Sequence, residues 1–428
     1  MTAPRIKVGI VGQGCAGMAT AFHLLKNAHV PVTLDMLDAH PLGSGATGVA
    51  AGLLHPLAPS GKPLWHGMAS YTKAATLVHE SSTLAAKRTP PLGTNDDPFW
   101  RPTALFRPAA TDKQRRQFEK NIGWEPREDL LGARCIHEDG VTTGVYLPDG
   151  IVIDTKRYLE ALSDACHVLA EERGNALTSH RQTIRSLDDL LPYKYDAIVI
   201  AAGAAVQEIA ELRHILQLDL CQGYTVDMAR ECPSSNAVEI VANMDTGTDS
   251  NDGTDSNDGT KHANAPPYPF TQPPTSILGQ PYIAFHAPNR AIIGATQRHG
   301  ISSAEAFQIL ANSHHDTSPQ ATQSASTLIQ AAQNATPDLT DDAWHTTSIR
   351  SGVRALPTRT HLGSIPYAGR LPSSIHPNCW LLAGLGARGL VYHALLGQLT
   401  ADAILHNAPN HTAFADYPDL LRWFTPQP

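Results

Sequence analysis

The sequence lacks the features that mark several common protein classes. Its six cysteines are scattered and form no Cys-x-x-Cys pair, so the usual pattern of a zinc or iron–sulfur site is missing. No apolar run approaches the roughly 20 residues that a membrane-spanning helix needs. No apolar leader precedes the first predicted strand. We therefore expect a cytoplasmic protein with reduced thiols, no membrane association and no metal.

Positive charge is also scarce. Lys and Arg total 32 against 40 Asp and Glu, which gives a net charge of −8. This balance disfavours broad electrostatic binding to nucleic acid, although it leaves a local basic patch open. Hydrophobic residues make up 42% of the 428 residues, enough to fill the cores of two domains.

A glycine-rich turn stands near the N-terminus. Residues 6–11 (IKVGIV) predict a short buried parallel strand, and residues 15–27 predict a helix. Between them Gly12, Gly14 and Gly17 follow the G-x-G-x-x-G pattern in the context that makes it informative. In a dinucleotide-binding unit these glycines allow a tight turn, the approach of a pyrophosphate and close helix–strand packing.

An acid follows at the expected distance. Asp38 ends the second predicted strand, 21 residues after Gly17, where a carboxylate can accept hydrogen bonds from ribose hydroxyls. The alternative is a structural turn followed by a chance acid. Residues 195–205 (YDAIVIAAGAA) predict another compact strand that ends in small residues, among them Gly203. Together these segments predict a nucleotide-binding sheet but do not choose between FAD and NAD.

Residues 245–267 have a different composition. The hexapeptide TDSNDG is repeated in tandem there and apolar residues are few, which predicts a disordered surface insertion. The Asp spacing superficially resembles a calcium loop, but the terminal bidentate Glu is missing. Further on, residues 282–296 predict a β-hairpin with an Asn-Arg turn.

The motifs also carry a family resemblance. In chain order they are GQGCAGMATAFHLL, LDAHPLGSGATGVAAGLLHP, YDAIVIAAGAA, YIAF with AIIGAT, SGVRALP with LGSIP, and GLGARGLVYHALLG. With them the chain resembles the D-amino-acid oxidase/glycine oxidase superfamily of FAD-dependent oxidoreductases. SGATGVAAGLLHP and GLGARGL are in particular similar to the oxidase domain of the bacterial bifunctional enzyme that makes methylaminomethyl-uridine in tRNA.

This resemblance implies an α/β fold with two domains. A discontinuous Rossmann-type FAD-binding domain would comprise residues 1–90, 150–218 and 348–428. A second α+β substrate domain, built on a mostly antiparallel sheet, would comprise residues 91–149 and 219–347. We expect FAD to be held non-covalently, because the nearest cysteine, Cys379, lies in an apolar strand and should pack there.

The resemblance also implies which residues contact FAD. At the pyrimidine edge of the flavin the resemblance places Gly386, Arg388, Gly389 and Leu390, which would stabilise negative charge on the reduced ring. For Arg388 the alternative is a solvent-facing neighbour of a turn. We expect the two glycine-lined helix starts to hold opposite ends of the cofactor. The cofactor-binding residues expected are Gly12, Gly14, Cys15, Ala16, Gly17, Asp38, Ser44, Gly45, Ala46, Thr47, Gly52, Leu53, Leu54, Gly203, Gly386, Arg388, Gly389 and Leu390.

Three residues are expected at the substrate. Arg354 in SGVRALP matches the arginine that holds a substrate carboxylate in glycine-oxidase-like enzymes, and the alternative is an interdomain ion pair. Tyr282 matches a tyrosine that orients substrate, or is a plain strand aromatic. His55 lies where a loop should pass the flavin, and a structural role is at least as well supported. The pair His314 and His315 is not expected to bind a metal.

The function that the resemblance implies is FAD-dependent oxidation of a C–N bond in an amino acid or a carboxylate-bearing secondary amine. Hydride transfer, imine hydrolysis and reoxidation by oxygen need no dedicated protein acid or base, so we name no catalytic residue. One alternative is removal of the carboxymethyl group from carboxymethylaminomethyl-uridine in tRNA. Another is a non-catalytic flavin-binding scaffold.

Overall fold

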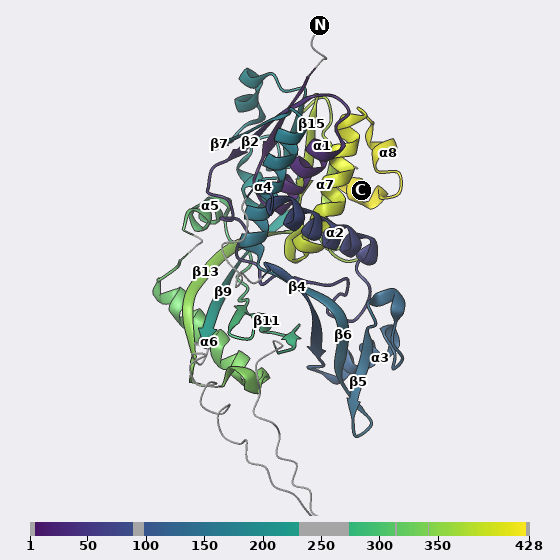
Figure 1. The fold of residues 1–428 in the computed structure, drawn as a ribbon, viewed down its shortest axis with the longest axis vertical. Coiled ribbons are helices and arrows are strands. Elements are labelled where there is room, and N and C mark those ends of the chain that lie inside the picture. The colour runs from purple at the N-terminus through teal and green to yellow at the C-terminus, as the bar shows by residue number, and fades with distance from the viewer. Residues whose placement is uncertain (1–4, 89–97, 231–273, 313–314, 341, 425–428) are drawn as a thin grey trace, which may run out of the picture.

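The computed structural model of the protein describes residues 5–88, 98–230, 274–312, 315–340 and 342–424. The insertion predicted at residues 245–267 and the histidine at position 314 lie outside these residues. In the described part the chain forms two sheets, one above the other in Figure 1, with both chain ends at the upper sheet.

The first sheet has the strand order β14-β15-β8-β1-β2-β7, and all of its strands except β14 run parallel. From β1 the chain adds β2 on one side, whereas β8 pairs with the other side. Ligands bind at the carboxyl ends of strands at such a switch point. The strands are β1 (Ile6–Val11), β2 (Val32–Asp38), β7 (Ala176–Arg181), β8 (Ala197–Ile200), β14 (Tyr367–Arg370) and β15 (Cys379–Ala383).

Helices α1, α4 and α7 contact strands of this sheet, and α2 packs against α4 and α7 (Figure 1). They are buried through small and aliphatic side chains that join one core with β1, β2 and β8. The side chain of Asp154 accepts the backbone N–H of Arg157 at 3.2 Å and so caps the start of α4. The helices are α1 (Cys15–Asn27), α2 (Gly67–Ala85), α4 (Thr155–Glu172) and α7 (Gly389–Leu405).

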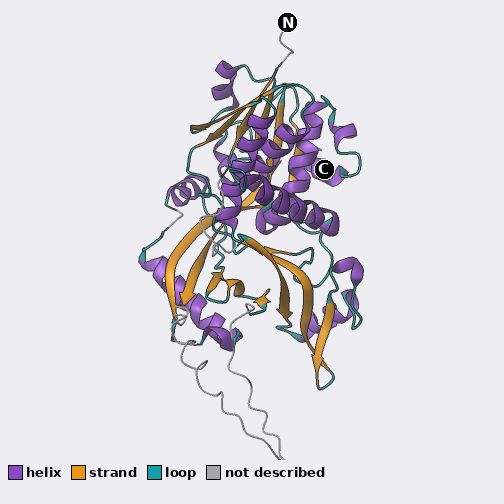
Figure 2. Cartoon of the chain, in the orientation of Figure 1, coloured by secondary structure: helices purple, strands orange, loops and turns teal. Residues whose placement is uncertain are grey.

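The second sheet has the order β13-β9-β12-β11-β10-β4-β6-β3, with β5 paired to β6, and it curves below the first (Figure 2). It is antiparallel except where β10 meets β4. The predicted hairpin is confirmed as β11 and β12, which turn at Pro288–Asn289, one residue earlier than expected. The strands are β3 (Leu53–Leu54), β4 (Trp100–Pro108), β5 (Arg134–Glu138), β6 (Val141–Ile153), β9 (Leu218–Arg230), β10 (Ser276–Ile277), β11 (Tyr282–Ala287), β12 (Arg290–Gly294) and β13 (Trp344–Pro357).

Shorter helices cover the edges. The remaining α-helices are α3 (Asp112–Asn121), α5 (Ser303–Ala311), α6 (Pro319–Ala335) and α8 (Asn410–Ala413). The 3₁₀ turns are η1 (Glu128–Leu130), η2 (Leu187–Tyr193), η3 (Gly203–Glu208), η5 (Pro337–Leu339), η6 (Gly386–Arg388) and η7 (Pro418–Phe424). Among the described residues no helix has the length and apolarity to span a membrane.

The fold class is confirmed, because a mostly parallel sheet with helices accompanies a mostly antiparallel one. The strands do not stop at the predicted domain limits, however. β13 runs across the limit at residue 348, and β6 runs across the limit at residue 150. Long strands pass from one sheet toward the other without a linker, so the division into two domains stays a prediction.

Candidate functional site

A cavity of about 390 Å³ lies at the carboxyl ends of β1, β2 and β8 and extends to the second sheet. Its volume is in the range of small-molecule and cofactor sites. Most of the predicted site residues line it. These are Gly12, Gly14, Cys15, Ala16, Asp38, Gly45, Ala46, Thr47, Gly52, Leu53, His55, Gly203, Tyr282, Arg354, Gly386, Arg388, Gly389 and Leu390.

Three of the predicted site residues do not line the cavity. Leu54 is fully buried in the core of the first sheet, Ser44 is 3% exposed, and Gly17 packs within α1. The structure differs here from the expectation that Ser44 and Leu54 line the cofactor, whereas Gly17 has the packing position expected of it. Successive side chains of a strand point to opposite faces, so in β3 Leu54 packs in the core and Leu53 lines the cavity.

The turn between β1 and α1 is shaped by glycines. A Cβ at Gly12, whose φ is +106°, would lie 2.4 Å from the Ala201 carbonyl oxygen. A Cβ at Gly17 would lie 2.0 Å from the Gly12 carbonyl oxygen, so neither position can carry a side chain. Gly14 differs, because its Cβ would meet nothing closer than Thr47 Oγ1 at 3.6 Å. Its lack of a side chain leaves the start of α1 open to the cavity.

Asp38 holds this turn from the end of β2. One carboxylate oxygen accepts the Gln13 N–H at 2.8 Å, and the other accepts the His40 N–H at 2.9 Å. A carboxylate has further acceptor sites beyond these two bonds. Asp38 can therefore still accept the predicted hydrogen bonds from the ribose hydroxyls. Sequence reasoning missed the structural part of this role. We call residues 12–17 together with Asp38 the glycine end of the cavity.

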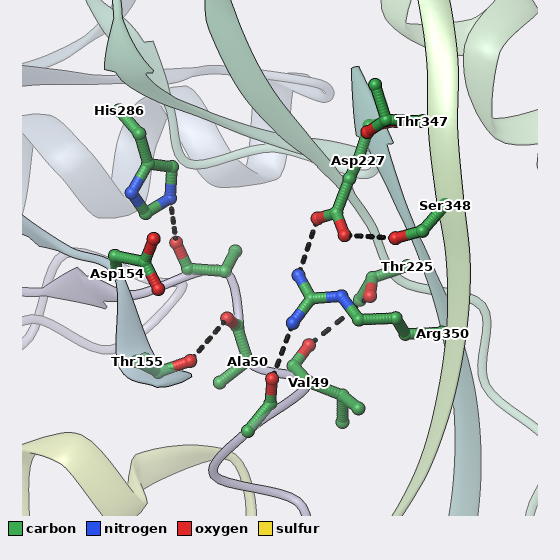
Figure 3. A network of polar contacts seen from close by, with 12 residues as sticks. Val49, Ala50, Asp154, Thr155, Thr225, Asp227, His286, Thr347, Ser348 and Arg350 are labelled. Carbon is green, nitrogen blue, oxygen red and sulfur yellow. Dashed lines mark hydrogen bonds and ion pairs between the residues drawn. The ribbon is translucent and has the colours of Figure 1, made fainter. Parts of the chain in front are cut away.

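The loop at residues 43–52 is anchored by side chains of other elements (Figure 3). Its four carbonyls at positions 48–51 each accept a hydrogen bond from a different element. The donors, in order, are Arg350 of β13, Thr225 of β9 at 3.3 Å, Thr155 of α4 at 3.1 Å and His286 of β11 at 3.0 Å. Arg350 also forms an ion pair with Asp227 at 2.6 Å. The loop backbone that walls the cavity is thereby fixed to the second sheet and to α4.

A second helix start meets the cavity beside the first. Arg388 is the N-cap residue of α7, which has no side-chain cap, as the start of α1 has none. A Cβ at Gly389 would lie 3.7 Å from Cys15 Sγ. The two helix starts therefore lie close together, and which part of the cofactor each of them contacts stays a prediction. They are neighbours because α1 and α7 pack along each other on one face of the sheet.

Arg388 lines the cavity instead of facing bulk solvent. Burial lowers the pKa of its guanidinium, and the positive charge of Arg354 lowers it further. Arg354 itself is half-buried on β13, and its one hydrogen bond in the described part is a weak contact of 3.7 Å with Cys221 Sγ. No carboxylate of the described residues pairs with Arg354, so the alternative of an interdomain ion pair finds no partner there.

Tyr282 and His55 are both neutral at ordinary pH. Burial raises the pKa of the Tyr282 phenol to about 12, although Arg354 opposes this shift. Burial lowers the pKa of His55 well below 6.5, and the nearby Arg107 and Arg388 add to the effect. His55 Nδ1 accepts the Leu57 N–H at 3.2 Å, which places the ring proton on Nε2. His55 can therefore act as a hydrogen-bond donor but is a poor base.

Sequence reasoning missed Arg107, which lies on β4 and lines the same cavity. It is 9% exposed, and its Nη1 donates to the Leu278 carbonyl at 2.9 Å. Its Nε is buried and has no partner among the described residues. Burial lowers its pKa to about 9, and Arg388 contributes to the shift. The one signal in the sequence is an arginine between apolar residues in the segment ALFRP. A single sequence gives no reason to choose this arginine over the others as a site residue.

We call Arg107, Arg354 and Arg388 the arginine end of the cavity. The lining contains two carboxylates, and both have partners of their own. Asp38 accepts the backbone bonds described above, and Glu208 pairs with Arg185 at 3.1 Å. Across the described chain no group of three metal-ligating side chains occurs. The arginine end thus offers positive charge without an acidic counterpart from the described protein.

The chain was compared with known proteins. Over 94% of this chain and 95% of the other, it is similar in structure to glycine oxidase from Geobacillus kaustophilus, with a TM-score of 0.64 and 18% identity. Iminodiacetate oxidase from Chelativorans sp. BNC1 gives a TM-score of 0.62 at 17% identity over 96% and 98%. The FAD-bound L-alpha-glycerophosphate oxidase from Mycoplasma pneumoniae gives 0.55 at 14% over 94% and 95%. No curated protein matches the sequence.

The residues present fit FAD. Two uncapped helix starts meet at one cavity, so backbone N–H groups and the positive helix ends are available to phosphates and to a polar ring edge. Gly14 leaves open the space that a Cβ would occupy, and Asp38 lies at the end of β2. The sequence matches the family described as FAD dependent oxidoreductase over residues 7–403. The chain therefore belongs to this family and is an FAD-dependent oxidoreductase.

Proposed function

We propose that this enzyme oxidises a C–N bond of an amino acid or of a secondary amine that bears a carboxylate. The observation that carries the proposal is Arg354, whose guanidinium lines the cavity with no carboxylate partner among the described residues. A planar guanidinium binds a carboxylate through two parallel hydrogen bonds, which fixes both the position and the orientation of the ligand.

The chain's own residues position the substrate. Arg354 would bind the carboxylate, and Tyr282, which remains a neutral phenol, would donate or accept a hydrogen bond beside it. His55 would offer its Nε2–H. None of these groups needs to exchange a proton with the substrate. When bound, FAD supplies the acceptor for the hydride that leaves the substrate α-carbon, and dioxygen or another acceptor reoxidises it.

The remaining chemistry follows from the substrate. Loss of a hydride from the α-carbon of a neutral amine leaves a protonated imine, and water then converts it to a carbonyl compound and an amine. The residues expected to hold FAD are those of the glycine end, the loop at residues 43–52 and the start of α7. Non-covalent attachment remains our expectation, and Cys379 is fully buried in β15.

Anaerobic mixing of the FAD-loaded enzyme with glycine, sarcosine and D-amino acids tests the proposal. A substrate should bleach the flavin absorbance. Arg354→Ala should lower kcat/KM by about 100-fold, because a hydrogen-bonded contact with a charged group contributes about 3 kcal/mol. Arg359→Ala is the matched control, since it removes the same charge from an exposed position outside the cavity. Equal activity of the two variants would contradict the proposal.

A narrower alternative is removal of the carboxymethyl group from carboxymethylaminomethyl-uridine in tRNA, which is also oxidation of a C–N bond next to a carboxylate. The comparisons add no support for tRNA as a partner, and the net charge of −8 weighs against it. Adding the free nucleoside and the modified tRNA to the same panel separates the two. Only a tRNA substrate would lose affinity steeply as the salt concentration rises.

A further inference from the structure

The arginine end holds more positive charge than the proposed reaction uses. Its three guanidinium groups come from β4, β13 and the start of α7, and all line one cavity. A substrate with one carboxylate and a neutral amine gives a partner to Arg354 alone. Arg388, at the start of α7, is expected beside the polar edge of the flavin. Arg107 is then left without an anionic partner.

Arg107 is held in the wall of the cavity. Its side chain is nine-tenths buried, and one of its nitrogens is fixed by the Leu278 carbonyl at 2.9 Å. Its Nε is buried without a partner among the described residues. Burying a cation without a counter-charge is costly, and the cost falls when an anion enters the cavity. The three arginines also repel one another, which adds to the cost of burying them. The charge of Arg388 contributes to the lowered pKa of Arg107, and the charge of Arg354 contributes to the lowered pKa of Arg388.

The sheet places Arg107 apart from Arg354. In the strand order β13-β9-β12-β11-β10-β4, these two arginines lie on the first and last strands, and β11 with Tyr282 lies between them. The sheet is curved (Figure 2), and both arginines line the same cavity. A carboxylate bound by Arg354 would thus lie on the Tyr282 side of the cavity, and a second anionic group would be met by Arg107 from another strand.

We propose that the substrate carries two acidic groups and that Arg107 binds the one farther from Arg354. The chemical class is a dicarboxylic amine, either an acidic amino acid or an N-carboxymethyl amino acid. This inference rests on the proposed function, because Arg354 is taken to hold the carboxylate next to the reacting carbon.

A matched pair of compounds tests the inference on the FAD-loaded enzyme. Sarcosine and iminodiacetate differ only by the second carboxylate on the N-methyl carbon. We expect kcat/KM for iminodiacetate to exceed that for sarcosine by about 10- to 100-fold, as one charged hydrogen-bonded contact contributes. D-alanine, D-aspartate and D-glutamate form a second series that varies the distance between the acidic groups.

Arg107→Gln should abolish the preference for the diacid, because it removes the charge and retains much of the side-chain volume. Arg107→Lys should restore part of it. Arg116→Gln, at an exposed position of α3, is the control and should keep the wild-type ratio. If the diacid and the monoacid lose activity equally in Arg107→Gln, Arg107 serves the cofactor or the fold and the inference is overturned.

Binding without turnover separates this inference from the proposed function. Calorimetry with the wild-type holoenzyme should show that succinate or malonate binds about 10-fold or more tightly than acetate, whether or not any amine is oxidised. Inactivity toward every amine, together with tight dicarboxylate binding, would overturn the proposed function and keep the two-anion site. Equal affinity for acetate and the dicarboxylates would overturn the two-anion site, even where sarcosine is oxidised and Arg107→Gln fails to fold.

Discussion

The glycine end and the arginine end of the cavity differ in what faces the ligand. At the glycine end the backbone of one short turn does so, and side chains are missing where a Cβ would strike a neighbouring carbonyl. At the arginine end charged side chains from three elements do so, and two of them have pKa values lowered by burial. One end is therefore defined by a local stretch of chain, and the other by how distant strands are arranged.

This difference predicts the consequence of adding a single methyl group at the glycine end. Gly12→Ala should fail to fold or lose more than about 4 kcal/mol of stability, because its Cβ would lie 2.4 Å from a backbone oxygen at a φ of +106°. Gly14→Ala should change the stability of the apoprotein by about 1 kcal/mol or less, since its nearest contact is 3.6 Å. Urea unfolding of both apoproteins measures the contrast.

Gly14→Ala should nevertheless lose FAD, because the new Cβ occupies space at the uncapped start of α1. The flavin absorbance per protein after reconstitution gives the result. A Gly14→Ala protein that retains wild-type affinity for FAD would mean that the pyrophosphate does not approach this backbone. The glycine end would then be a structural turn only.

The same contrast explains what could be predicted from the sequence. Gly12, Gly14 and Asp38 lie within 27 residues, so their spacing alone indicates their meeting. Arg107 reaches the cavity because β4 joins the sheet, and its parallel pairing with β10 links residues 171 positions apart (Ser276 with Leu105), which no local pattern encodes. The anchoring of residues 48–51 was missed for the same reason, because its donors lie on four separate elements.

Acid should act on the helix that presents Arg388. His393 of α7 is fully buried; its Nδ1 donates to the Leu390 carbonyl at 3.0 Å, and its Nε2 accepts the Tyr158 hydroxyl at 2.7 Å. Burial lowers its pKa to about 4. Between pH 6.5 and 4 the unfolded chain therefore binds a proton that the folded chain does not, so the free energy of unfolding falls as the pH falls.

The expected loss from His393 is on the order of 3 kcal/mol, complete near pH 4 and absent above pH 6.5. Urea unfolding of the apoprotein at pH 7.5, 5.5 and 4.5 measures the total slope, to which other buried histidines contribute with the same sign. The double variant Tyr158→Phe with His393→Leu isolates the pair, because it removes both polar groups together. An unchanged slope in this variant would assign the acid sensitivity to other groups.

The smallest effect is expected at Asp38, where the glycine end depends on a side chain. Asp38→Asn replaces one acceptor oxygen by an amide NH₂, so either the Gln13 N–H or the His40 N–H loses its partner. We expect the apoprotein to lose about 1 kcal/mol of stability and the FAD affinity to fall by about 10-fold. Urea unfolding and fluorescence titration with FAD measure the two effects separately, with the exposed Asp416→Asn as the control.

The two measurements distinguish the roles of Asp38. If it only ties the turn to the end of β2, the variant should lose stability, and FAD binding should weaken only as far as the turn becomes disordered. If Asp38 also accepts hydrogen bonds from the ribose hydroxyls, the variant should lose FAD affinity beyond that amount. The reason is that the amide nitrogen of Asn would face two further donors. Addition of FAD would then stabilise Asp38→Asn against urea by less than it stabilises the wild type at the same concentration. Equal stabilisation of both proteins would limit Asp38 to holding the turn.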